Sequence, residues 1–168
     1  LYPFAATIAR PGCTLDEAIE NIDIGGPAMV RSAAKNHGHV AVVTDPRDYE
    51  AVLAEMRSTS GAVGAETRLR LAQKAFSHTA AYDGAISNYL TALDGTGRAT
   101  GVPTRLNMNF ELAQPLRYGE NPHQQGARYR RVNETSWWDG VIQHGGVALS
   151  YLNLYDTEAA WVLAHDLG

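Results

Sequence analysis

The stretch NIDIGGPAMVRSAAKNH, residues 21–37, predicts a helix that begins after a Gly-Gly turn. Pro27 suits the first position of this helix, because its φ is already helical and its missing N–H needs no intrahelical partner there. The apolar residues that follow at helical spacing predict the buried stripe: Met29, Val30, Ala33 and Ala34. The fold is therefore expected to be built around this helix.

The same stretch has two chemical interpretations. Gly25 and Gly26 place no side chain between a ligand and the backbone, and the helix start adds a positive dipole end, which is typical of an anion site. Arg31 and Lys35 lie one turn apart, where like charges oppose helix formation unless an anion is near. The alternative is an ordinary turn before a helix whose cations pair with surface carboxylates. The spacing matches neither a P-loop nor a dinucleotide fingerprint.

Asp23 comes directly before the turn and also has two possible roles. A shifted pKa would let its carboxyl group act as an acid or base, whereas an isolated Asp more often caps a helix or turn. Lys35 lies eight residues beyond Pro27, a rise of about 12 Å along the axis. The two side chains meet only if the chain before Pro27 folds back beside the helix.

The residues around this stretch predict alternating elements. Thr14 and Glu17 form a capping box that opens a short helix. The β-branched run 39–45 predicts a strand, and 45–57 supplies a cap, a first-turn proline and the next helix. Residues 66–90 predict a long helix with Leu69, Ala72, Phe76, Ile86 and Leu90 on its apolar face. This order predicts an α/β fold.

The pattern changes after a Gly- and Thr-rich segment at 94–104, which reads as part of a linker. Extended runs are expected at 105–112, 126–132 and 146–154. Asp156 can cap a final helix. A second domain is therefore expected to begin beyond the linker.

Composition excludes several classes of protein. The 168 residues are 45% hydrophobic and 19% charged with a net charge of −4, which gives no broad electrostatic reason to expect nucleic acid or a membrane surface. The single cysteine excludes an internal disulfide framework, and no Cys/His spacing indicates a metal site. No apolar run could span a bilayer and no leader is visible, so a cytoplasmic setting is expected. Both ends read as cuts in a longer chain.

The loop PLRYGENPHQ, residues 115–124, combines a bidentate cation, an aromatic face and several amides. Arg117 and Tyr118 suit a planar, anionic small molecule. The alternative is a rigid turn in which Arg117 pairs with Glu120 or Glu111.

Six blocks in order resemble a known family: LYPF at 1–4, IDIGG at 22–26, RSAAKNH at 31–37, KAFSHTAAYD at 74–83, LRYGENPHQ at 116–124 and LSYLNLYDTEAAW at 149–161. The chain resembles the bifunctional purine biosynthesis enzymes that join inosine monophosphate (IMP) cyclohydrolase to aminoimidazole carboxamide ribonucleotide (AICAR) formyltransferase. The resemblance implies that residues 1–93 end a methylglyoxal-synthase-like cyclohydrolase domain, 94–114 form a linker, and 115–168 begin a cytidine-deaminase-like α/β formyltransferase domain.

The resemblance also implies an activity and its residues. The family formylates AICAR with 10-formyltetrahydrofolate and closes formyl-AICAR to IMP with loss of water. Its catalytic residues map onto Tyr2, Asp23 and Lys35, its cyclohydrolase substrate-binding backbone onto Ile24, Gly25 and Gly26, and its AICAR-binding residues onto Arg117, Tyr118 and Asn153. No metal is implied. A structural ion pair is the preferred interpretation of Arg31.

Purine nucleotides and a second copy of the chain, forming a homodimer, are the implied partners. This fragment alone is expected to be inactive, because other residues of both family sites lie outside it. The alternatives are a non-catalytic nucleotide-sensing module of the methylglyoxal-synthase-like fold and a scaffold whose helices only mediate dimerisation.

Overall fold

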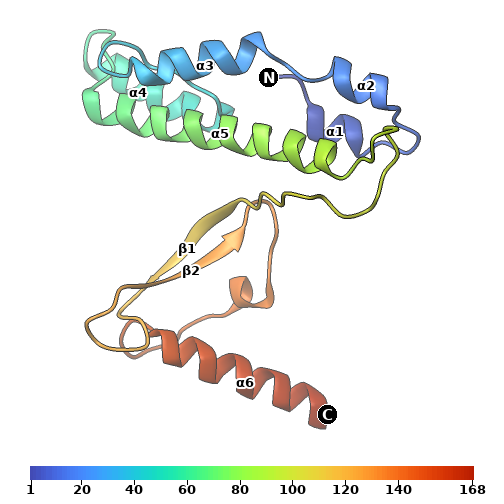
Figure 1. Cartoon of the computed structure of the whole chain (residues 1–168). Coiled ribbons are helices and arrows are strands. Elements are labelled where there is room, and N and C mark those ends of the chain that lie inside the picture. Colours follow the sequence, from blue (N-terminus) through green and yellow to red (C-terminus); the bar gives the residue numbers. More distant parts are fainter. The chain divides into compact units, whose positions relative to one another are not determined.

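The computed structural model describes residues 1–168 and divides them into two compact units, Leu1–Asn107 and Met108–Gly168 (Figure 1). The chain is an α/β protein with one two-stranded sheet. The first unit contains α1 (Phe4–Ile8), α2 (Leu15–Glu20), α3 (Gly25–Lys35), the 3-10 helix η1 (Pro46–Asp48), α4 (Tyr49–Ser58) and α5 (Ala65–Thr91). The second contains β1 (Phe110–Leu116), β2 (Gly126–Arg131), the 3-10 helix η2 (Trp137–Gly140) and α6 (Tyr151–Leu167).

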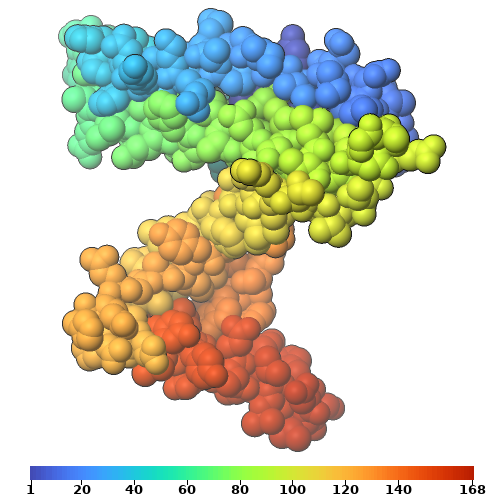
Figure 2. Space-filling view, in the orientation of Figure 1, coloured from blue at the N-terminus to red at the C-terminus, as the bar shows by residue number.

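The core of the first unit lies where α3 packs against α5. Ala34, Ala72 and Ala75 are buried there, with Val30 and Val42 packed against them. In the space-filling view the blue atoms of α3 lie directly against the green atoms of α5 (Figure 2). Because the central side chains are single methyl groups, the two helix backbones can approach closely.

The N-terminal helix α1 is held on α5 by aromatic packing. Phe4 is almost completely buried and meets the rings of Tyr82 and Tyr89 edge-on, at centroid distances of 6.4 and 5.7 Å. Edge-to-face geometry is favourable because the positive ring edge meets a negative ring face. This contact fixes the first residues of the chain over the middle and end of α5.

Several helix starts follow their predicted caps. Thr14 accepts the Glu17 backbone N–H at 3.2 Å and donates its own N–H to the Glu17 carboxylate at 2.9 Å, which confirms the capping box. Asp45 likewise caps η1, with Pro46 at its first position. The third helix differs slightly, because α3 already begins at Gly25 and Pro27 is its third residue rather than its first.

The strand predicted at 39–45 is wrong. Residues 40–45 belong to no helix or strand, and the only backbone ladder contact in the first unit is an isolated bridge between Leu93 and Ala99. A β-branched run becomes a strand only when a neighbouring strand accepts its hydrogen bonds, and none lies beside it here.

Four of the predicted inward residues are on the surface, namely Met29, Leu69, Phe76 and Leu90, with Leu69 45% and Leu90 38% exposed. Met29 is 74% exposed and Phe76 is 40% exposed, so the buried stripe of α5 runs instead through Leu71, Ala72, Ala75 and Thr79. The apolar period therefore located the helix correctly but not the face that it buries.

A buried ion cluster joins η1 to α5. Asp48 is 5% exposed, and its carboxylate accepts hydrogen bonds from Lys74 at 2.7 and 2.8 Å and from Arg70 at 2.8 Å. The bond from Lys74 and then the bond from Arg70 lower the pKa of Asp48 below its ordinary value. Both cationic side chains are partly exposed, whereas the carboxylate is buried. The carboxylate is therefore the group whose burial would be costly without these partners.

The segment predicted as a linker is divided between the units. Residues 94–107 return along the end of α5: Thr100 donates its N–H to Ala92 at 2.7 Å, and Asn107 exchanges two hydrogen bonds with the Asn88 side chain at 2.7 and 2.8 Å. The remaining residues, from Met108, lead into β1.

The second unit begins with a β-hairpin. β1 pairs antiparallel with β2 from Phe110–Arg131 to Leu116–Gly126, with a register shift at Ala113. The second strand lies where it was predicted, but the first spans Phe110–Leu116 and not 105–112. Asn107 makes its bonds with α5 instead, which removes the start of the predicted run from the strand.

The final helix starts earlier than predicted. Ser150 accepts the Asn153 backbone N–H at 3.4 Å, and the Asn153 side chain accepts the Ser150 N–H at 3.0 Å, forming a capping box. The extended run predicted at 146–154 is therefore wrong, because residues 146–150 belong to no strand and residues from Tyr151 onward are helical. Asp156 lies inside α6 rather than at its cap. A local Ser-x-x-Asn box competes successfully with an extended conformation because it satisfies two backbone N–H donors.

No residue of α6 is buried, and the helix is tied to η2 by stacking of Trp161 on Trp137 at 4.7 Å between centroids. None of the buried apolar side chains of the protein lies in the second unit. None of the helices combines the length and apolar character needed to cross a membrane.

Replacement of Ala75 by Leu should destabilise the first unit. The Ala75 side chain is fully buried between α3 and α5, and added carbons in such a site typically cost about 1–3 kcal/mol. Thermal unfolding should show a lower Tm for Ala75→Leu. Ala80→Leu on the exposed side of the same helix is the control and should leave the Tm nearly unchanged; equal Tm values for the two variants would contradict the packing argument.

The Asp48 cluster should make stability depend on pH. Its lowered pKa means that the folded protein binds fewer protons than the unfolded chain once the pH approaches the ordinary value of 3.8. The stabilisation is therefore complete above that value and is lost as the pH falls through the lowered pKa. Asp48→Asn should reduce the free energy of unfolding at pH 7 and flatten its decline between about pH 5 and 3, as measured by urea titration.

The control for this titration is Asp83→Asn, which removes an exposed carboxylate from α5. It should keep both the neutral-pH stability and the acid decline of the unmodified protein. An acid decline that is equally steep in Asp48→Asn would exclude Asp48 as its source.

Candidate functional site

Asp23 joins two of the predicted site segments. It lies between α2 and α3, where its carboxylate accepts the Gly26 N–H at 2.8 Å and the Tyr2 N–H at 3.3 Å. The predicted capping role is therefore confirmed, since a side-chain oxygen satisfies an early helix donor. The start of the chain and the start of α3, which are 21 residues apart, meet at this carboxylate.

A tyrosine that the sequence analysis did not select holds this junction. The Tyr82 hydroxyl accepts the Asp23 backbone N–H at 2.7 Å and donates to the Asn21 carbonyl at 3.1 Å. A partly buried tyrosine needs a partner for its hydroxyl, but no local pattern indicates a partner 59 residues away. Only the fold brings the two together.

The glycines before the helix have different surroundings. A Cβ at Gly26 would lie 2.9 Å from the Asp23 carboxyl carbon, so a larger residue would displace the carboxylate, whereas Gly25 faces open space. Ile24 has no side-chain capping bond and is 76% exposed. The positive end of α3 thus already carries one carboxylate while Gly25 leaves its backbone accessible.

The predicted cations lie away from this junction. Lys35 is the last residue of α3, a rise of about 15 Å from Gly25 for an 11-residue helix. The structure therefore does not bring Lys35 to Asp23. The Arg31 guanidinium lies 5.6 Å from the centroid of the Phe76 ring, and no carboxylate forms an ion pair with it. The ion pair expected for Arg31 is wrong, and a cation–π contact takes its place.

The loop between β1 and β2 is a closed turn. Gly119 donates to the Gln124 carbonyl at 2.9 Å, and the Gln124 side chain accepts the Asn121 N–H at 2.8 Å. Arg117 lies over the Tyr118 ring, 4.7 Å from its centroid, with its guanidinium 3.2 Å from the ring hydroxyl. The two predicted substrate-binding residues therefore form one stacked pair.

The alternative ion pairs for Arg117 are not formed. Glu111 instead accepts a hydrogen bond from Arg130 across the hairpin at 2.7 Å. This bond raises the pKa of Arg130. Arg117 thus presents an exposed guanidinium without a carboxylate partner, whereas the charge of Arg130, far from the loop in the strand register, is balanced by Glu111.

The backbone on either side of Ser150, just before Asn153, is hydrogen-bonded to this pair. The Tyr151 N–H donates to the Tyr118 carbonyl at 3.1 Å, and the Arg117 N–H donates to the Leu149 carbonyl at 2.8 Å. The start of α6 is therefore fixed beside the loop. The Asn153 side-chain oxygen is engaged by Ser150 in the cap of α6.

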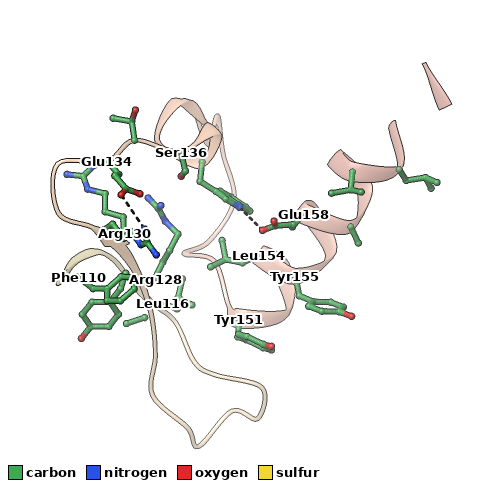
Figure 3. Close-up of a pocket in the computed structure, with 18 of the residues that line it drawn as sticks. Phe110, Leu116, Arg128, Arg130, Glu134, Ser136, Tyr151, Leu154, Tyr155 and Glu158 are labelled. Carbon is green, nitrogen blue, oxygen red and sulfur yellow. Dashed lines mark hydrogen bonds and ion pairs between the residues drawn. The ribbon is translucent and has the colours of Figure 1, made fainter. Parts of the chain in front are cut away.

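A hollow of about 940 Å³ lies between the hairpin and α6 in the second unit (Figure 3). It does not include the predicted pair Arg117 and Tyr118. Arg128 faces it but is paired with Asp139 at 3.0 Å, and the bonds of Asp139 to the Ser136 N–H and then to Arg128 lower its pKa to about 2. The hollow is lined mainly by apolar groups, including Leu116, Leu154, Tyr155, Val162 and Leu163.

Comparisons with known proteins agree with the order of these segments. A model of the AICARFT/IMPCHase bienzyme family matches residues 33–168. The chain is 54% identical over 167 residues to the bifunctional purine biosynthesis protein PurH of Neisseria gonorrhoeae and 55% identical over 167 residues to the protein of the same name from Neisseria meningitidis. Each similarity covers 96% of this chain and 32% of the relative, so the chain spans about a third of the length of the curated relatives it matches.

The range matched by the family model begins within α3 and includes α5, the Arg117 loop and α6. Tyr2 and Asp23 precede it. Since the match takes in most of the chain and parts of both units, this chain belongs to the AICARFT/IMPCHase bienzyme family.

Proposed function

We propose that this chain is part of a bifunctional enzyme that formylates AICAR with 10-formyltetrahydrofolate and closes formyl-AICAR to IMP. The observation that carries the proposal is the family match over residues 33–168, which includes elements of both units. The two reactions are consecutive, because the product of the first is the substrate of the second.

The proposed fold assignment follows the same division. Residues 1–93 would form the later part of a methylglyoxal-synthase-like cyclohydrolase domain, 94–114 a linker, and 115–168 the first part of a cytidine-deaminase-like formyltransferase domain.

For ring closure, Asp23 is proposed as the proton acceptor. The carboxamide nitrogen of formyl-AICAR attacks the formamide carbon and gives up one of its two protons. The formamide nitrogen gives up its own proton as the C=N bond forms, and the two protons leave with the formamide oxygen as water. The Asp23 carboxylate accepts two backbone N–H groups, at Gly26 and Tyr2, yet a carboxylate has about four lone-pair sites. It therefore keeps capacity to accept the nitrogen-bound proton in the transition state.

The other residues of this site are proposed to bind and polarise the substrate. Ile24, Gly25 and Gly26 provide backbone at the positive end of α3, which favours negative charge developing on the formamide oxygen. Tyr2 lies beside Asp23 through its N–H. Lys35 is too far along α3 for direct proton exchange with Asp23, so we assign it a contact with another part of the same nucleotide.

For formyl transfer, Arg117 and Tyr118 are proposed to bind AICAR. Their stacked arrangement presents a cation and an aromatic ring together, which suits a planar ring with an anionic group. Asn153 is proposed as a further ligand because the start of α6 is bonded to the same loop. No residue of this chain is assigned to the folate donor.

The whole enzyme is proposed to act as a cytoplasmic homodimer on purine nucleotides, without a metal ion and without nucleic-acid or membrane partners. One observation favours the alternative of a nucleotide-sensing module: Asp23 already has a structural role as the cap of α3. Calorimetric titration of the full-length protein with IMP, beside a formyl-AICAR cyclisation assay, distinguishes the two functions: binding with turnover supports the enzyme, and binding alone supports the sensing module.

Asp23→Asn in the full-length enzyme should lower kcat for ring closure by about 10²–10⁴-fold, the usual contribution of a general base. Asparagine can still accept the Gly26 N–H, so the helix start should be kept. Lys35→Ala should lower kcat/KM with a large part of the loss in KM. The assay is conversion of formyl-AICAR to IMP, with Asp16→Asn on the exposed face of α2 as the control; near-normal turnover in Asp23→Asn would refute the assignment.

Arg117→Ala should weaken formyl transfer without affecting ring closure. Loss of a guanidinium that contacts an anionic substrate should raise KM for AICAR by about tenfold or more, since hydrogen bonds to charged groups contribute about 1.5–3 kcal/mol. Steady-state assays of both reactions on the same preparation give the comparison. Arg105→Ala, which removes an exposed arginine from the first unit, should change neither reaction; an equal loss in both reactions for Arg117→Ala would indicate misfolding instead.

A further inference from the structure

We propose that Tyr82 is a positioning residue for ring closure and that its hydroxyl acts by holding Asp23 in place. This inference rests on the proposed function, because it takes Asp23 as the proton acceptor. Tyr82 belongs to α5 and lies 59 residues from Asp23 in the sequence. It therefore connects the candidate site with the longest helix of the first unit.

The hydroxyl of Tyr82 makes two hydrogen bonds to the same short loop. It accepts the Asp23 N–H at 2.7 Å and donates to the Asn21 carbonyl at 3.1 Å. One group thus satisfies a donor and an acceptor on either side of Ile22. A loop held at both ends from a rigid helix has little freedom to shift, which fixes the backbone from which the Asp23 side chain extends.

The ring of Tyr82 holds the other chain segment of the site, residues 2–4, by packing. It packs edge-on against Phe4 with 6.4 Å between centroids, and the Phe4 N–H donates to the Tyr2 carbonyl at 2.8 Å. Tyr2 in turn donates its N–H to the Asp23 carboxylate at 3.3 Å. Tyr82 is therefore in contact with both chain segments that meet at this carboxylate, one through its hydroxyl and one through its ring.

These two functions of the side chain can be separated experimentally. Removing only the hydroxyl leaves the packing against Phe4 and releases the loop at Asn21 and Asp23. The carboxylate keeps its bond to Gly26 but loses the restraint on its own backbone. Proton transfer depends steeply on the placement of the acceptor, so even a small displacement of the Asp23 carboxylate should reduce the rate.

The test is Tyr82→Phe in the full-length enzyme. We expect kcat for ring closure to fall about tenfold, with little change in KM for formyl-AICAR and none in formyl transfer. Tyr89→Phe is the matched control, because Tyr89 packs on the same face of the molecule against Phe4 but the structure gives its hydroxyl no hydrogen bond to a loop of the site. It should retain full ring-closing activity, and both variants should remain folded at the assay temperature.

A double variant identifies the route of the effect. If Tyr82 acts through Asp23, then Tyr82→Phe added to Asp23→Asn should lower the residual kcat by less than twofold. A full tenfold further loss would show that Tyr82 acts independently and would overturn the inference, as would normal kcat in the single variant. Normal turnover in Asp23→Asn would instead reject the proposed proton acceptor itself, so the two failures give different results.

Discussion

The architecture of the first unit depends on the close contact between α3 and α5. Ala34, Ala72 and Ala75 allow this contact because their side chains, against which Val30 and Val42 pack, are single methyl groups. The closeness of α3 to α5 determines where the chain before α3 can run. Asn21 and Asp23 consequently come within reach of the Tyr82 hydroxyl on α5. The hydrogen bonds that hold Asn21 and Asp23 are thus a consequence of apolar packing farther along the same two helices.

Sequence reasoning succeeded where the determining interactions are local. The Thr14–Glu17 box and the Asp45–Pro46 start each require only a few neighbouring residues, and both are formed as expected. It failed where a distant partner decides the structure. Residues 40–45 have strand-forming side chains but no neighbour, and at the last helix the Ser150–Asn153 box outcompetes an extended conformation that looked equally acceptable from composition.

The candidate site shows the same distinction. Asp23 and Gly26 lie three residues apart, so their hydrogen bond could be anticipated from the motif alone. The length of α3 also made the separation of Asp23 from Lys35 foreseeable. By contrast, the partners of Arg31 and Asp23 on α5 could not be anticipated, because both Phe76 and Tyr82 are ordinary members of a long amphipathic pattern. Sequence identified the proposed proton acceptor, Asp23, but not Tyr82, which bonds to its backbone.

The surface of α6 has a practical consequence. Trp161, Val162 and Leu163 are consecutive and exposed, and at about 100° per residue they cover roughly 200° of the helix circumference. Apolar groups spread so widely are usual for a helix enclosed on several sides. In a preparation of these 168 residues, the exposed apolar surface of α6 would favour self-association. Aggregation at high protein concentration, rather than a low free energy of unfolding, would then limit experiments on it.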